Sequence, residues 1–151
     1  MTKHELTDTF TRDVQAPVDE SVVQSLFPEG CKLELSADAR MLSLLSTDSP
    51  HILAQQQFTK NEWWILMALF TSHPYYAPYD ILLASLTLLS PADCRRRIHD
   101  AQALGSEELR QELKPVRRVL PGLRAKLSKL SPRLKISSIH EMGYALTTSS
   151  E

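Results

Sequence analysis

The sequence predicts an α+β fold in which a small antiparallel sheet comes first, helices follow and a β-hairpin comes last. Three observations support this order. Apolar and polar side chains alternate from residue 31, apolar residues recur every three or four positions between residues 59 and 130, and short apolar runs return between residues 134 and 147. Alternation is typical of half-buried strands, and the longer period is typical of helices that pack on a core. A chain of 151 residues can bury one core of this kind.

The N-terminal sheet is expected from three short segments. Residues 31–35 alternate apolar with charged side chains, and apolar runs follow at 41–45 and at 51–54. The last run comes after the turn-forming residues 47–50. We expect two or three short antiparallel strands here.

The folded domain is expected to cover residues 29–148, preceded over residues 1–28 by an N-terminal arm or tail that is partly disordered. Residues 1–20 are polar and acidic and show no sustained period. Residues 22–27 do have apolar side chains at helical spacing, but the Pro-Glu-Gly at 28–30 would end a helix after them.

The clearest helix start is at Thr59. Thr59 and Glu62 fit a capping box, in which each side chain accepts a hydrogen bond from the other residue's backbone N–H group. The helix is expected to run to Ser72, and its buried side is marked by the spacing of four residues, Trp63, Leu66, Met67 and Phe70.

Shorter helices are expected in the middle of the chain. The first covers 78–86 and has Pro78 at its first position. The second covers 91–104, with Ser90 as its cap, and ends at Gly105. A third begins with Ser106 as its cap.

A basic helix and a hairpin complete the chain. Five apolar residues form one helical stripe, namely Val116, Leu120, Leu123, Leu127 and Leu130. Pro121 lacks a backbone donor and is followed by Gly122, so we expect a kink or break near 120–122. Residues 134–147 predict strand, turn and strand, with Gly143 at positive φ in the turn.

Charge is distributed unevenly along the chain, although its net charge is only −1. Residues 1–57 carry nine acidic and four basic side chains, whereas residues 58–151 carry nine acidic and thirteen basic ones. Residues 113–140 contain eight basic side chains and no acidic one. Such a local field attracts a polyanion even when the whole chain is near neutral.

Three short motifs occur in a defined order. Residues 58–62, FTKNE, are similar to an L-T-x-x-E that opens a first helix, and residues 123–127, LRAKL, resemble an L-R-x-K-L that ends a recognition helix. Residues 136–146, ISSIHEMGYAL, resemble the wing signature I-x-T-V-x-G-x-G-Y-x-L. Over residues 31–148 the chain therefore resembles the effector domain of OmpR/PhoB-type response regulators. Only about 30 residues precede the first strand, so we expect no receiver domain.

The resemblance implies a winged helix-turn-helix that binds double-stranded DNA and regulates transcription. Its recognition helix would enter the major groove, and its wing would lie near the adjacent minor groove. Cations on both elements can contact phosphates and base edges. The DNA-binding residues expected on these grounds are Lys114, Arg117, Arg118, Arg124, Lys126, Arg133, Lys135 and His140.

An alternative stays open, in which the domain is a protein–protein interaction module that has lost sequence-specific DNA binding. Pro121 and Gly122 stand where the family usually has polar or basic side chains, and His140 and Glu141 stand where an arginine and a glycine are common. The resemblance also admits a homodimer and a contact with RNA polymerase through the connection at 87–106. The other possibility for that connection, with its three successive arginines, is a solvated helix surface.

We expect neither catalysis nor a cofactor or metal. The sequence has no G-x-S-x-G, P-loop or H-E-x-x-H motif, and its four glycines make a phosphate-binding loop improbable. Cys94 and His99 alone are a weak metal signal. The N-terminus lacks a secretory signal, and the longest apolar stretch is too short to cross a membrane. Two isolated cysteines suit a reducing compartment. We therefore expect a cytoplasmic protein with no membrane partner.

Overall fold

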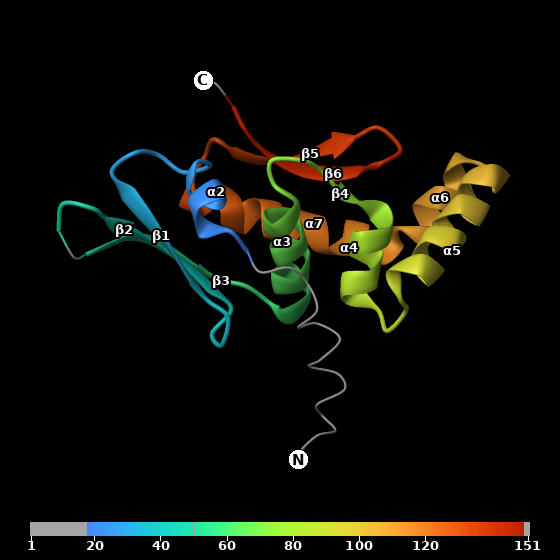
Figure 1. The fold of residues 1–151 in the computed structure, drawn as a ribbon, viewed down its shortest axis with the longest axis horizontal. Helices are drawn as coiled ribbons and strands as arrows, with labels where there is room; N and C mark the ends of the chain where they lie inside the picture. Colours follow the sequence, from blue (N-terminus) through green and yellow to red (C-terminus); the bar gives the residue numbers. More distant parts are fainter. Residues whose placement is uncertain (1–17, 50, 150–151) are drawn as a thin grey trace, which may run out of the picture.

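Two small antiparallel sheets lie at different sides of a group of helices in the structure, a computed structural model that describes residues 18–49 and 51–149 (Figure 1). The α+β class predicted from the sequence is confirmed. In chain order, the elements are α2 (Glu20–Gln24), β1 (Cys31–Ser36), β2 (Met41–Ser46), β3 (Ile52–Gln57), α3 (Lys60–Ser72), β4 (Ala77–Pro78), α4 (Tyr79–Leu86), α5 (Pro91–Leu104), α6 (Ser106–Glu112), α7 (Lys114–Leu130), β5 (Leu134–Ile139) and β6 (Gly143–Thr148).

The first sheet has the order β1-β2-β3, where two or three strands were expected. Its register pairs Cys31 with Ser46 and Ser36 with Met41. Alternate side chains of β1 and β2 point into the core, where Leu33, Leu42 and Leu44 are buried. The sheet lies at the end of the molecule opposite α5 and α6 (Figure 1).

The core begins before residue 29, the start expected for the domain. In the described part of the expected arm, α2 is followed by Leu26 and Phe27, and both are buried together with Val23. The side chain of Gln24 donates to the carbonyl of Cys31 and accepts from the N–H of Leu33, each at 2.9 Å. Gln24 therefore occupies hydrogen-bonding groups of β1, the edge strand of the first sheet.

Helix α3 has the predicted capping box. The N–H of Glu62 donates to Thr59 Oγ1 at 3.2 Å, and the N–H of Thr59 donates to Glu62 Oε1 at 2.8 Å. The helix ends at Ser72 as expected, and it buries Trp63, Leu66 and Phe70, while Met67 is half-buried.

Two of the middle helices begin one residue away from their predicted starts. Pro78 is the N-cap of α4 rather than its first residue, because its extended backbone still pairs with Gly143. Ser90 caps α5 as predicted, and α5 ends at Gly105. Ser106 is the first residue of α6 rather than its cap, because Gly105 alone separates the two helices. None of the described helices combines the length and apolarity that a membrane span requires.

Helix α7 is continuous from Lys114 to Leu130 through Pro121, so of the expected kink or break the break is wrong. All five residues of the predicted apolar stripe are buried. Burying a leucine side chain stabilises by about 1.5–3 kcal/mol, and several such contacts together outweigh the cost of about 3 kcal/mol for an internal proline. The carbonyl of Arg117, which loses its partner, belongs to an exposed residue.

The second sheet has the order β4-β6-β5, so the predicted C-terminal hairpin gains a third, two-residue strand. Gly143 begins β6 and is not the positive-φ residue of the turn; that residue is Glu141, with a φ of 57°. Gly143 is required for a different reason. A Cβ atom at position 143 would lie 2.0 Å from the carbonyl oxygen of Ala77 on β4.

Candidate nucleic-acid interface

The side of α7 away from the core carries exposed cations. Because α7 buries one stripe along its length, the residues between the stripe positions face outward. The exposed basic residues of the helix are Lys114, Arg117, Arg118, Arg124 and Lys129. Helix α7 contains no acidic residue, so every charged side chain on its exposed surface is positive.

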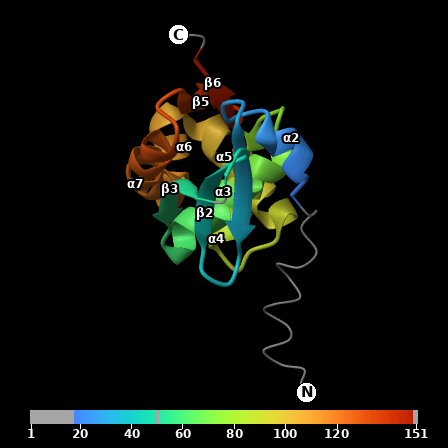
Figure 2. The same ribbon diagram turned by 90° about the vertical axis from the view of Figure 1, so that its left-hand side faces the viewer.

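Arg124 connects α7 to the hairpin. Its Nη2 atom donates to the carbonyl oxygen of Ile136 on β5 at 3.1 Å. Arg117 lies two helical turns earlier on the same side of α7. Lys135 precedes Ile136 on β5 and is exposed. The structure thus brings Arg117 and Arg124 to the side where α7 meets β5, whereas Lys135 lies on the strand face opposite that of the buried Ile136. Figure 2 shows β5 and β6 above α7.

Lys126 faces another way, although it was expected in the same set. Its Nζ atom donates to Glu62 Oε1 at 2.7 Å and lies 5.7 Å from the centre of the Phe58 ring. The side chains of Lys126 and Glu62 are 28% and 11% exposed, which leaves little of this ion pair to solvent. Lys126 is three residues from Leu123 and four from Leu130, and this spacing could have indicated its half-buried position.

The ion pair sets the ionisation of Glu62. Burial raises the pKa of this carboxyl, but hydrogen bonds from Lys126 and Thr59, together with the charge of Lys126, outweigh it. The pKa of Glu62 therefore lies below its ordinary value. Gly122 leaves room for this carboxylate, because a Cβ atom at position 122 would lie 2.6 Å from Glu62 Oε2.

The remaining predicted residues lie on the hairpin and before it. Arg133 and Lys135 are exposed at the start of β5, and His140 is exposed in the turn at its far end. Strand β5 has six residues, which separates these ends by about 20 Å. The Nε2 atom of His140 lies 3.6 Å from Glu141 Oε2. The backbone carbonyl of Glu141 accepts a hydrogen bond from the side chain of Gln102 on α5 at 3.3 Å. The hairpin turn is thus held against α5, away from Arg133.

The cations of α7 and β5 differ from those of α5 and α6 in their partners. Four arginines of α5 and α6 form ion pairs, Arg95 with Asp80, Arg96 with Asp93, Arg97 with Glu112 and Arg110 with Glu107. Within residues 18–49 and 51–149, no carboxylate pairs with Lys114, Arg117, Arg118, Arg124, Lys129, Arg133 or Lys135. Sequence reasoning included all of these except Lys129 among the site residues. The exposed position of Lys129, one residue before the buried Leu130, could have identified it.

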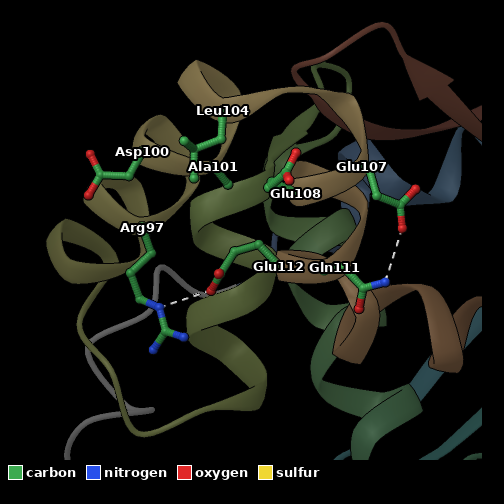
Figure 3. A pocket seen from close by; sticks show the side chains of 8 residues that line it. All are labelled: Arg97, Asp100, Ala101, Leu104, Glu107, Glu108, Gln111 and Glu112. Carbon is green, nitrogen blue, oxygen red and sulfur yellow. Dashed lines mark hydrogen bonds and ion pairs between the residues drawn. The ribbon is translucent and has the colours of Figure 1, made fainter.

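A second surface feature is a shallow hollow between α5 and α6, on the connection that was expected to reach RNA polymerase. Ala101 and Leu104 contribute apolar atoms, and the polar residues that line the hollow are Arg97, Asp100, Glu107, Glu108, Gln111 and Glu112 (Figure 3). The Leu104 side chain is 74% exposed. Arg97 donates to Glu112 at 2.9 Å on one side of the hollow.

The described residues contain no group of three or more metal-ligating side chains that could hold a metal ion. Of the weak pair considered from the sequence, Cys94 is buried and His99 is exposed. Burial raises the pKa of the Cys94 thiol, which opposes formation of the thiolate that binds metals. No protein-family model, curated protein or solved structure was found to match this chain.

Proposed function

We propose that this chain is a winged-helix transcriptional regulator of the OmpR/PhoB type, which binds duplex DNA with α7 in the major groove and the β5–β6 hairpin as its wing. The topology supports the fold part of this proposal. Helices α3, α4 and α7 pack against one another, and the hairpin after α7 forms a sheet with β4, which lies between α3 and α4 in the chain. A helix-turn-helix followed by a wing has this order.

The contacts made by the three family-like motifs give further support. The Lys126–Glu62 ion pair joins the motif at 58–62 to the motif at 123–127. In the wing motif, Glu141 has positive φ at the position where the family commonly has glycine. Gly143, at the second glycine position, lies too close to Ala77 for any larger residue.

The single observation that carries DNA binding is the group of unpaired cations on α7 and the start of β5. Neighbouring helices neutralise their arginines with carboxylates, whereas these seven cations face solvent without one among the described residues. Like charges held close together repel one another, so such a surface is favourable chiefly when a polyanion binds it. Phosphates spaced along a duplex supply that charge.

A salt titration tests this proposal. We expect anisotropy measurements with mixed-sequence duplexes to give a log Kd that rises with log salt, with a slope of about 3 to 4.5 if three to five phosphates are contacted. Arg117→Ala/Arg118→Ala should reduce the slope by about 2, since each lost phosphate contact removes about 0.9. Arg95→Ala/Arg96→Ala is the matched control and should leave the slope unchanged. Equal binding by the wild type and the α7 variant would defeat the residue assignment.

The hollow between α5 and α6 favours a second candidate function, a protein-interaction module. An exposed leucine near Asp100 and Glu108, carboxylates that pair with no cation among the described residues, suits a basic protein segment with an apolar side chain. RNA polymerase is the partner that the family resemblance admits for the 87–106 connection. Leu104→Asp should abolish co-purification of such a partner without changing affinity for DNA. If the wild type co-purifies with the partner but binds no duplex, the second function is favoured over the first.

The proposal includes a cytoplasmic location and a homodimer. Cys31 and Cys94 are free thiols, as is usual in a reducing compartment. Two-fold dimers are the commonest assemblies of soluble proteins and bind paired half-sites on DNA. Light scattering with and without a duplex that carries two sites tests the dimer.

A further inference from the structure

The outermost ridge of α7 changes character along its length. Lys114, Arg118, Pro121 and Ala125 follow one another at intervals of four, three and four residues, and all are exposed. This spacing places them on one side of the helix, directly opposite the buried stripe. The first two of these positions are therefore cationic and the next two are apolar, and the exposed Ser128 and Lys129 follow at the end of the helix.

The part of the ridge from Arg118 to Ala125 matches the dimensions of a short base sequence. Seven residue steps of an α-helix advance about 10 Å, and base pairs are spaced about 3.4 Å apart, so the ridge covers about three base pairs. Arg118 can donate two hydrogen bonds to guanine O6 and N7. Pro121 and Ala125 have no polar side-chain atoms, so they can distinguish bases only by apolar contact.

The neighbouring glycine does not supply an alternative contact. The Cβ direction of Gly122 points toward Glu62 Oε2, so even a larger residue at this position would meet α3 before it met a ligand.

In the major groove, the C5-methyl group of thymine is the apolar group that base edges present. An apolar half-ridge is complementary to that methyl group.

We propose that Arg118, Pro121 and Ala125 are the specificity-determining residues of α7, and that they select duplexes in which guanine is followed by thymine through a guanidinium contact and one or two thymine-methyl contacts. This inference rests on the proposed function, because it requires α7 to enter the major groove. It also assigns a role to Pro121, one of the two residues that replace the polar side chains expected there.

Replacing thymine by deoxyuridine tests the inference, because this change removes only the methyl group. The probes are a 24-base-pair alternating d(GT)·d(AC) duplex and the same duplex with every thymine replaced by deoxyuridine, both measured by anisotropy at one salt concentration. We expect the thymine duplex to bind about 4-fold more tightly for each methyl contacted, the affinity ratio that corresponds to burying one such carbon. Arg118→Ala should weaken binding to both duplexes.

Variants assign the effect to the ridge. Pro121→Ser/Ala125→Ser should bring the ratio of the two affinities close to one, while Ala103→Ser on α5, also exposed, should leave it unchanged. A thermal melt of each variant shows that it folds. If the wild type binds both duplexes equally, the inference is overturned while DNA binding stands. If the double variant keeps the preference, the residue assignment is overturned. If no duplex binds, the proposed function itself fails.

Discussion

Glu141 occupies a backbone conformation that its side chain disfavours. Its φ of 57° lies in the left-handed region, which costs a non-glycine residue about 1–2 kcal/mol. We expect Glu141→Gly to raise the free energy of unfolding by about 0.5–1 kcal/mol, since the gain is reduced by the greater freedom of glycine in the unfolded chain. Urea denaturation measures the change. His140→Gly, in the same turn but outside the left-handed region, should destabilise instead.

Gly143 has the opposite constraint, because it lacks space rather than conformational freedom. Gly143→Ala should destabilise by about 3 kcal/mol, since the added Cβ atom meets the Ala77 backbone, which cannot move without separating β4 from β6. Gly122→Ala is the comparison. There the added atom meets the end of the Glu62 side chain rather than backbone, so urea denaturation should show a smaller loss, which comes from weakening the contacts of Glu62 with Thr59 and Lys126.

The Glu62–Lys126 pair links stability to pH. Because the pKa of Glu62 is lowered in the folded protein, its contribution is fully present above the ordinary value of 4.5 and is lost as pH falls through the folded-state pKa. Lys126→Met should cost about 1–3 kcal/mol at pH 7, because it leaves a buried carboxylate unpaired. Urea midpoints of the two proteins should converge as the pH falls below 4.5 and through the folded-state pKa of Glu62. A difference that stays constant throughout the acid range would contradict this linkage.

At the scale of elements, α7 retains a proline that weakens it. Pro121→Ala should restore a hydrogen bond to the Arg117 carbonyl and stabilise the protein by about 2–3 kcal/mol in urea denaturation. Pro115→Ala is the matched control at the first turn, where the backbone N–H has no helical partner, so little gain is expected. If both variants are equally stable, the ring of Pro121 does not strain α7.

Elements whose signals are local could be predicted from the sequence. The Thr59–Glu62 capping box, the Ser90 cap and the buried stripe of α7 each depend on residues within a few turns, and the structure has all of them. Features set by distant residues could not be predicted. β4 exists only through its pairing with β6, and Pro78 precedes α4 for the same reason.

In the candidate site, too, features set by nearby residues could be predicted and features set by distant residues could not. The positive charge of residues 113–140 is visible in the sequence, and most of its cations are exposed as expected. Whether a cation is available for a ligand depends on carboxylates elsewhere in the fold. Glu62 lies 64 positions before Lys126, so that pairing could not be inferred from residues near either one.

At the scale of the whole molecule, DNA binding should appear as thermal stability. A ligand that binds only the folded state stabilises it by about 2.7 kcal/mol at 100 times its Kd, which is about 5–10 °C in Tm for a chain of this size. We expect duplex DNA to produce this shift in thermal melts at low salt, and Arg117→Ala/Arg118→Ala to reduce it. A shift that is equal in high salt would indicate that the interaction is not electrostatic.

The side chain of Gln24 has a practical consequence for handling the protein. By binding the backbone carbonyl of Cys31 and the N–H of Leu33, it prevents strands of other molecules from pairing with β1, one of the two edge strands of the sheet. A recombinant fragment trimmed at residue 29 would lose this shield together with three buried apolar side chains, Val23, Leu26 and Phe27. Such a fragment should precipitate during purification, whereas one that starts before Asp19, the cap of α2, should stay monodisperse.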